Sequence, residues 1–212
     1  MKIPKLLKSR TFLVIALMVG ARASLADWYV VPSGSMNPTI QEGDYIFVNK
    51  LAYGAKLPFT DMQVLPAQTP SRGDVVVFFK QPESTRMVKR VIGIPGDTVE
   101  LKGNSLTING QLAEYTLIES TGDKLVVQER LGSFVHEMQT LPNARSPQST
   151  TAPMIVPEGK LLVMGDNRDN SFDSRFFGLV DQTDVVGKAL GVVASFSPDT
   201  YLPRVERIGK SF

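Results

Sequence analysis

Short runs rich in β-branched and aromatic residues follow one another along most of the chain, and each ends at Gly, Pro, Asn or Asp. This pattern is typical of strands joined by tight turns. Between two of the runs, Asn109-Gly110 suits the positive φ angles of a two-residue hairpin. Because no long stretch after residue 31 keeps a helical period, the sequence predicts a mostly β fold. The predicted strands are 45–49, 75–79, 87–94, 106–108, 111–113, 124–128, 160–164 and 185–196.

One later stretch lacks this pattern. Residues 143–157 are rich in turn formers and weakly apolar, which predicts an exposed loop.

The first thirty residues have a different character. A basic cluster at Lys2, Lys5, Lys8 and Arg10 precedes an apolar run that begins at Thr11. Residues 11–31 suffice for a helical span of roughly 30 Å, with Trp28 and Tyr29 at its interfacial end. The positive-inside rule then places 1–10 in the cytoplasm and 32–212 on the outer side. The alternative is a cleaved signal peptide, because Ala-Ser-Leu-Ala26 offers small residues at −3 and −1.

Composition narrows the chemistry. The net charge of +2, from 23 basic and 21 acidic residues, leaves no basic excess for a nucleic acid partner. The absence of cysteine excludes thiol nucleophiles and thiolate metal sites. With His136 as the single histidine, a multi-histidine metal site is excluded and a Ser/His triad has one possible base. These facts favour a hydroxyl nucleophile with a base other than imidazole.

Residues 31–40 contain a candidate nucleophile. Ser33 and Ser35 flank Gly34, and Pro38 restricts the backbone that follows. Such a segment is able to hold a hydroxyl rigidly while its amide serves as an oxyanion donor. The alternative is an ordinary Ser/Gly/Pro turn.

A second candidate lies where Lys89 and Arg90 interrupt the apolar strand predicted at 87–94. Strand alternation places the two cations on opposite faces. One of them would then enter an apolar environment, where desolvation and the neighbouring positive charge favour a neutral amine that acts as a base. The alternative is a solvated pair that protects an edge strand from aggregation.

A third stretch, 165–178, is unusually polar, with three aspartates, two arginines, two asparagines and two serines. It predicts a network of ion pairs and hydrogen bonds that fixes an irregular segment. A hydroxyl from it is also a candidate to orient the lysine.

Four motifs in this order resemble the type I signal peptidase (leader peptidase) family: Pro-Ser-Gly-Ser-Met-x-Pro-Thr at 32–39, Gly-Asp-Tyr-Ile-Phe-Val-Asn-Lys at 43–50, Lys-Arg-Val-Ile-Gly-Ile-Pro-Gly-Asp at 89–97 and Gly-Asp-Asn-Arg-Asp-Asn-Ser-x-Asp-Ser-Arg at 165–175. The resemblance covers about half the chain, and 115–156 fall where the family carries a variable insertion. It implies a signal-peptidase-like β domain with a small inserted subdomain after one N-terminal transmembrane helix. The activity implied is that of a membrane-bound serine endopeptidase in the plasma (inner) membrane, which removes signal peptides of exported preproteins after Ala-x-Ala and needs no cofactor or metal.

The resemblance also implies roles for residues. Ser35 would be the nucleophile and Lys89 its general base. Ser33 and the Ser35 amide would form the oxyanion hole, and Ser171 would orient the Lys89 amine. Arg90 with Asp166, and Asp173 with Arg175, would be structural ion pairs. The pockets for small residues at −1 and −3 would be lined by Val31, Met36, Ile40 and Val88. His136 has no counterpart in the motifs, so we expect it to be structural.

Three other functions remain alternatives. A pilin-maturing or conjugation-associated peptidase would share the Ser/Lys pair and act on one dedicated substrate. A self-cleaving repressor would also share it, but the predicted anchor and the absence of a DNA-binding domain argue against that. A non-catalytic membrane-tethered β domain would not need Ser35, Lys89 and Ser171, all of which are present.

Overall fold

The computed structural model describes residues 26–56, 63–66 and 68–212. The predicted cytoplasmic segment 1–10, and the predicted anchor as far as residue 25, lie outside the described residues. Within the described ranges, no helix has the length and apolar character needed to cross a membrane.

The largest sheet of the described residues is antiparallel and seven-stranded. Its order is β1 (Ala26–Val30), β2 (Asp44–Asn49), β16 (Val185–Ser195), β5 (Val75–Lys80), β6 (Thr85–Gly93), β14 (Lys160–Met164) and β15 (Val180–Asp181). The consecutive strands β5 and β6 form a hairpin. In contrast, β16 lies between β2 and β5 although it is far from both in the sequence. This topology places segments distant in sequence beside one another.

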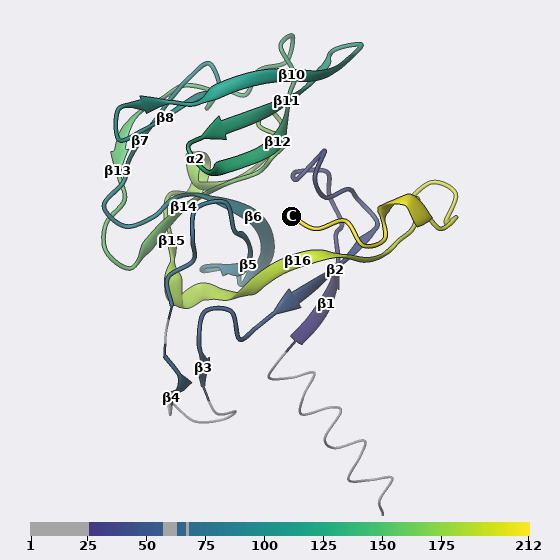
Figure 1. The fold of residues 1–212 in the computed structure, drawn as a ribbon, viewed down its shortest axis with the longest axis horizontal. Coiled ribbons are helices and arrows are strands. Elements are labelled where there is room, and N and C mark those ends of the chain that lie inside the picture. The colour runs from purple at the N-terminus through teal and green to yellow at the C-terminus, as the bar shows by residue number, and fades with distance from the viewer. Residues whose placement is uncertain (1–25, 57–62, 67) are drawn as a thin grey trace, which may run out of the picture.

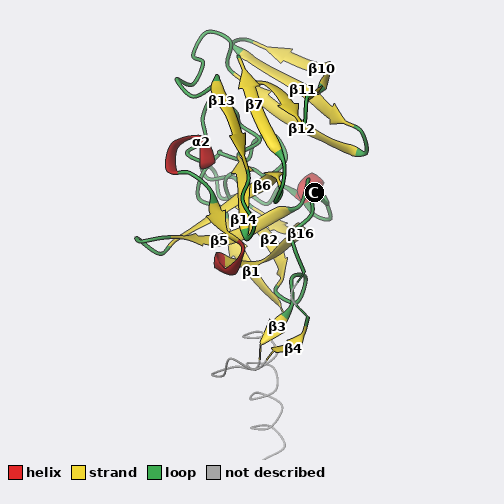
Figure 2. Cartoon of the chain, turned by 90° about the vertical axis from the view of Figure 1, so that its left-hand side faces the viewer, coloured by secondary structure: helices red, strands yellow, loops and turns green. Residues whose placement is uncertain are grey.

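Smaller sheets extend the molecule at its two ends. At one end lie β10 (Glu114–Thr121), β11 (Lys124–Leu131) and β12 (Phe134–Thr140), next to the sheet of β13 (Thr151–Ile155), β7 (Thr98–Lys102), β8 (Ser105–Ile108) and β9 (Gln111–Leu112). At the other end lie β3 (Ala55–Lys56) and β4 (Gln63–Leu65), as Figures 1 and 2 both show. The helices of the described part are short: α2 (Ser174–Phe177), η2 (Gln182–Asp184) and η3 (Val205–Arg207).

The mostly β prediction is confirmed, and each predicted strand corresponds to an observed one. Two boundaries were wrong. Residues 26–30 were assigned to the anchor, but they form β1 and pair in register with β2, with Trp28 opposite Phe47. Residues 143–157 were expected to form a loop throughout, but 151–155 form β13, whose backbone pairs with β7. In both cases the pairing partner lies far away in sequence, so local composition did not reveal the strand.

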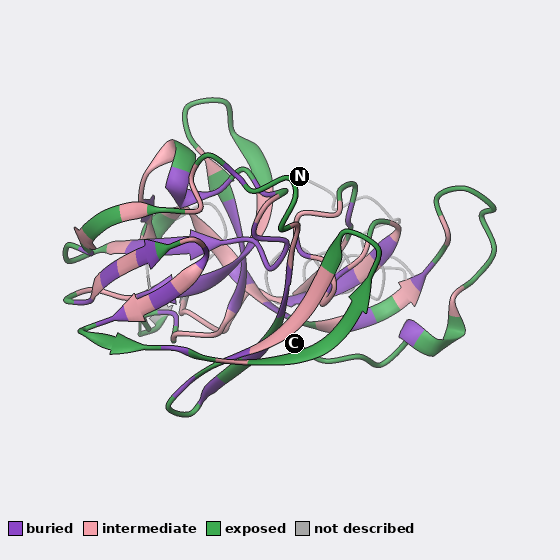
Figure 3. Cartoon of the chain, turned by 90° about the horizontal axis from the view of Figure 1, so that it is seen from above, coloured by how far each residue is buried: buried purple, intermediate pink, exposed green. Residues whose placement is uncertain are grey.

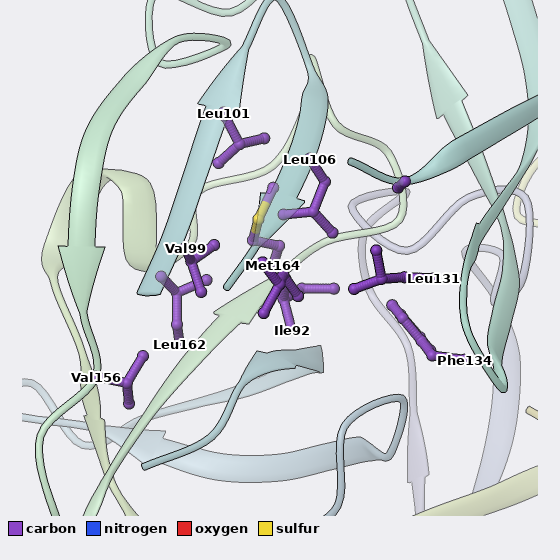
Figure 4. Close-up of a cluster of buried hydrophobic side chains, with 11 residues drawn as sticks. Ile92, Val99, Leu101, Leu106, Leu131, Phe134, Val156, Leu162 and Met164 are labelled. Atoms are coloured by element: carbon purple, nitrogen blue, oxygen red, sulfur yellow. The ribbon is translucent and has the colours of Figure 1, made fainter. Parts of the chain in front are cut away.

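Two hydrophobic clusters position the site. One lies between the β7–β8 hairpin and the strands β6 and β14, and includes Ile92, Leu106, Leu162 and Met164 (Figure 4). The other contains Val31, Met36 and Ile40 from the loop after β1. Figure 3 shows buried strand segments at the centre and exposed loops at the periphery. The apolar side chains of residues 31–40 therefore anchor their loop in the core.

Candidate active site

The loop after β1 is fixed by backbone hydrogen bonds at both ends. Val31 N–H donates to Asp44 O at 2.8 Å, and Gly43 N–H donates to Val31 O at 2.9 Å. Asn167 holds the middle of the loop, since its backbone N–H donates to Ser35 O at 3.1 Å and its side-chain amide donates to Gly34 O at 3.0 Å. The residues around Ser35 are thus fixed by contacts from distant segments, unlike those of an ordinary turn.

Lys89 lies on β6, which pairs with β5 on one side and with β14 on the other. Its side chain meets the loop after β1: Lys89 Nζ is 2.8 Å from Ser35 Oγ, and it also donates to Val88 O at 3.0 Å. Both Lys89 and Arg90 are 3% exposed. The alternative of a solvated pair on an edge strand is therefore wrong.

Burial changes the titration of this lysine. Loss of hydration lowers the pKa of Lys89 from 10.5 to about 8, while the carboxylates of Asp173 and Asp166 act in the opposite direction and the Arg175 guanidinium adds to the decrease. Desolvation always favours the neutral amine. The expectation that Arg90 supplies the opposing positive charge was wrong, because Arg90 is neutralised by Asp166 and the effective cation is Arg175.

Ser171 approaches the site without bonding directly to the lysine. Among the hydrogen bonds of the described residues, its hydroxyl donates to Asp173 Oδ2 at 2.7 Å, and no bond joins it to Lys89. The predicted direct orienting bond is therefore not present in this arrangement. Asp173 is a buried carboxylate, so its oxygens need hydrogen-bond donors, and the Ser171 hydroxyl is one of them. It also accepts a hydrogen bond from Gly165 N–H at 2.9 Å.

Gly165 allows this close approach. A Cβ at this position would collide with Ser171 Oγ and with the carbonyl oxygen of Ser35. Glycine is therefore required for the polar loop to lie directly against the Ser35 backbone.

Both expected ion pairs are present, and both are bidentate. Arg90 donates to the two oxygens of Asp166 at 2.8 and 2.7 Å. Arg175 donates to those of Asp173 at 2.8 and 2.9 Å. In each case the adjacent guanidinium keeps the pKa of the carboxyl below its ordinary value against the effect of burial. Paired in this way, these four residues support the site and do not supply a reactive group.

A further buried network escaped the sequence analysis. Arg168 donates to both oxygens of Glu129, at 3.0 and 2.6 Å, and Tyr115 donates to the same carboxylate at 2.7 Å. Arg168 lies in a recognised motif, but Glu129 and Tyr115 belong to the poorly matched insertion, where no motif marks them. The network joins the sheet of β10–β12 to the segment that holds Asn167.

His136 belongs to this network and fits its predicted structural role. Its ring stacks on Phe134 with centroids 4.6 Å apart, and its Nε2 lies 3.3 Å from Arg168 Nη2. Burial lowers the pKa of His136 to about 4, so the ring is neutral at physiological pH. Ser35 has Lys89 and not His136 as its basic neighbour.

A cleft of about 390 Å³ opens beside Ser35 and Lys89. Ser33, Val31, Met36 and Val88 are among its lining residues. Ile40, expected with them, is fully buried in the adjacent hydrophobic cluster and is not among the described residues that line the cleft. It supports the wall from behind.

The chemistry available here is that of a hydroxyl and an amine. In the described ranges no group of His, Asp or Glu side chains is arranged to hold a metal ion. A buried lysine with a lowered pKa, hydrogen-bonded to a serine hydroxyl in an open cleft, defines the Ser/Lys class of serine hydrolases.

Comparison with known proteins specifies the family. The family model described as "Signal peptidase, peptidase S26" matches residues 5–194. Signal peptidase I of Pseudomonas aeruginosa is 37% identical over 217 residues, which cover 93% of this chain and 76% of that protein. Signal peptidase I of Pseudomonas fluorescens is 36% identical, with 93% and 76% covered. Signal peptidase IB of Staphylococcus aureus is 37% identical over 165 residues, with 76% and 73% covered. The chain belongs to the signal peptidase family, peptidase S26.

A crystal structure of a signal peptidase I from Enterococcus faecalis is also similar. It is 28% identical, and the match covers 57% of this chain and 97% of that one with a TM-score of 0.37.

Proposed function

We propose that this chain is a membrane-bound serine endopeptidase that removes N-terminal signal peptides from exported preproteins, with Ser35 as nucleophile and Lys89 as general base. The observation that carries the proposal is the 2.8 Å hydrogen bond between Lys89 Nζ and Ser35 Oγ at the wall of an open cleft. The name signal peptidase I, shared by the Pseudomonas relatives, favours general preprotein processing over dedicated pilin maturation.

The reaction proceeds by acyl transfer. Neutral Lys89 takes the proton of the Ser35 hydroxyl as Oγ attacks the carbonyl carbon of the scissile bond. The lysine ammonium then gives this proton to the departing amine, which leaves an ester between Ser35 and the signal peptide. The neutral amine next activates a water molecule that hydrolyses the ester. Each step uses Lys89 to move one proton, so a pKa near neutrality serves both halves of the cycle.

The charge that develops on the carbonyl oxygen needs donors. The Ser35 backbone N–H is available, because within the described part of the chain it donates no backbone hydrogen bond. Ser33 lies on the same cleft wall, and its hydroxyl is our candidate for the second donor. Asn167 contributes indirectly by holding the Gly34 and Ser35 carbonyl groups, which sets the direction of the neighbouring amides.

The cleft walls account for a preference for small residues at −1 and −3. Val31, Met36 and Val88 form an apolar surface, and Val31 and Met36 are 4% and 1% exposed because they pack into the core. These side chains cannot move aside without disturbing the core. Specificity therefore comes mainly from steric exclusion of large side chains.

The proposed topology is a single span with the catalytic domain on the outer, periplasmic side. The described structure begins with β1 at Ala26, and Ser35 follows a few residues later. A membrane span ending shortly before β1 would hold Ser35 near the point where a translocated signal peptide leaves the lipid. The expected partners are therefore signal peptides and membrane lipid.

The test is cleavage of an Ala-x-Ala preprotein by the purified full chain in detergent. We expect Ser35→Ala to abolish cleavage while its unfolding transition stays within about 0.5 kcal/mol of the unchanged protein. Ser105→Ala, on β8 in a different sheet, is the matched control and should cleave normally. Cleavage by Ser35→Ala at a rate comparable with the unchanged chain would refute the assignment.

A further inference from the structure

The substrate cleft contains a cation that the proposed mechanism does not use. Arg86, on β6, is one of its lining residues, and its guanidinium carbon lies 4.1 Å from the centre of the Tyr29 ring, which lines the cleft from β1. A second aromatic ring, Phe79, lies 6.0 Å away. The backbone of Arg86 belongs to the β5–β6 pairing, but no ion pair or hydrogen bond of the described residues involves its side chain. Its guanidinium is thus held by aromatic faces and retains its N–H donors for a ligand.

The position of Arg86 along the cleft follows from the sheet. Each neighbouring pair in the order β1-β2-β16-β5-β6 is antiparallel, so β1 and β6 run in the same direction. Ser35 follows β1, and Lys89 lies three residues after Arg86 on β6. At about 3.3 Å per residue, Arg86 lies roughly 10 Å before Lys89, measured along the strand. The Arg86–Tyr29 contact therefore crosses the cleft on the side from which β1 and β6 run toward Ser35 and Lys89.

A bound peptide in extended conformation has the same rise per residue, so its fourth residue before the scissile bond is at about the level of Arg86. Side chains alternate in such a peptide. Those at −1 and −3 point toward the buried wall of Val31 and Met36, and the one at −4 points away from it. Arg86 lies on the same face of β6 as Val88, and both Val88 and Tyr29 pack against the cluster that contains Val31 and Met36, so the guanidinium lies on the side of this wall. Beyond the −3 pocket, the peptide side chain on this side that is nearest to Arg86 is therefore the one at −5.

We propose that Arg86 is a specificity-determining residue that favours an acidic side chain at position −5 of the substrate and disfavours a basic one. The inference rests on the proposed function, because it assumes that the signal peptide occupies this cleft. A carboxylate matches the guanidinium in charge and in hydrogen-bonding geometry. Tyr29 restricts the guanidinium to the cleft, which reduces the conformational entropy lost when the pair forms.

The expected effect is modest, because the pair is accessible to solvent. An exposed ion pair changes affinity by about two- to fivefold, and added salt weakens it. The effect should fall mainly on KM, because the −5 side chain interacts equally before and during the chemical step.

The experiment uses the full chain in a neutral detergent and three preproteins that differ only in having Glu, Gln or Lys at −5. We expect kcat/KM to be about two- to fivefold higher for Glu than for Lys at low salt. In Arg86→Gln this ratio should fall to about one, and in Arg86→Glu it should invert. Lys102→Gln is the control, because Lys102 is an exposed lysine on β7, in another sheet, and the ratio should not change.

Two variants of Tyr29 test the aromatic contact. Tyr29→Phe keeps the ring under Arg86 and should keep the preference for Glu. Tyr29→Leu removes the ring, so the guanidinium is no longer held in the cleft and the preference should weaken.

The possible failures are distinguishable. If the unchanged protein does not cleave the Gln preprotein, the proposed function fails. If it cleaves all three preproteins equally well, or if Arg86→Gln keeps the preference, the inference about Arg86 is wrong and the proposed function stands. A preference that appears only when anionic phospholipid vesicles replace the neutral detergent would also overturn the inference, because Arg86 would then bind lipid headgroups and not the substrate.

Discussion

Lys89 is the residue whose environment makes the strongest quantitative prediction. Burial lowers its pKa from 10.5 to about 8, which corresponds to about 3 kcal/mol of unfavourable free energy for the charged amine in the folded protein. With a pKa of about 8, about one lysine in ten is neutral at pH 7. With the ordinary value of 10.5, about one in three thousand would be neutral. The fold thus increases the population of the active base about three-hundredfold at that pH.

The first assay is the pH dependence of kcat/KM for a preprotein. Because the neutral amine is the base, log kcat/KM should rise with a slope of about one at low pH and level off above the Lys89 pKa of about 8. The His136 pKa of about 4 lies well below this range, so histidine should not contribute to the rise. A profile that is flat from pH 5 to 10 would refute the assignment of a titrating lysine.

The second assay measures the same free energy without catalysis. Below pH 8 the lysine is charged in both the folded and unfolded states, so the folded protein bears the full penalty. Between pH 8 and 10.5 the unfolded state binds the proton that the folded state has lost, so stability rises with pH and the penalty disappears. Lys89→Met should therefore be inactive but more stable at pH 7, by at most about 3 kcal/mol, and this advantage should vanish above pH 10.5. Urea unfolding of the two proteins at both pH values checks this, and a Lys89→Met variant less stable at pH 7 would contradict it.

Two other predictions follow from the site and its proposed anchoring. Gly165→Ala should reduce kcat by at least tenfold, because the added Cβ collides with Ser171 and the Ser35 carbonyl, whereas Gly122→Ala, at a turn with open space around it, should reduce stability by about 1 kcal/mol and leave kcat unchanged. If the anchor is retained, carbonate washing should leave the protein with membranes and N-terminal sequencing should give Met1 in both the active chain and Ser35→Ala. A chain that begins at Asp27 only in the active form would instead show self-processing after Ala26 and contradict the retained anchor.

The sequence pointed to the proposed reacting groups through the order of four motifs that resemble the type I signal peptidases, whereas the local patterns alone left an ordinary turn and a solvated pair as alternatives. Ser35 lies in a short segment dense in Gly and Pro, and Lys89 is a cation within an apolar strand. These patterns indicated two unusual residues but not their distance. The contact depends on the sheet that brings β2, β16 and β5 together between β1 and β6, and that arrangement depends on pairing between distant strands.

The sequence did not reveal the hydrogen-bond partner of Ser171 or the cation near Lys89, because both depend on residues that the fold brings together. Ser171 had two available partners, and its hydroxyl donates a hydrogen bond to the buried Asp173 carboxylate. The opposing charge near Lys89 was assigned to Arg90 because the two are adjacent in sequence, yet Asp166 neutralises Arg90 from a distant loop. The sequence shows which charged residues adjoin Lys89 along the chain. Their net effect on its pKa depends on the partners that the fold brings to them.

The buried ion pairs around the site follow from the need for an uncharged lysine. Each isolated carboxylate near Lys89 would raise the pKa of its amine and remove the neutral base. Pairing Asp166 with Arg90, and Asp173 with Arg175, offsets much of this effect, so desolvation remains the dominant cause of the low pKa. The Asp173 carboxylate also accepts hydrogen bonds from Gly165 and Ser171, which lie against the Ser35 backbone. The polar loop at 165–175 therefore lies against the proposed nucleophile, Ser35, and balances the charges around its proposed base, Lys89. A substitution that breaks the pair of Asp173 and Arg175 should alter both the geometry and the pH profile.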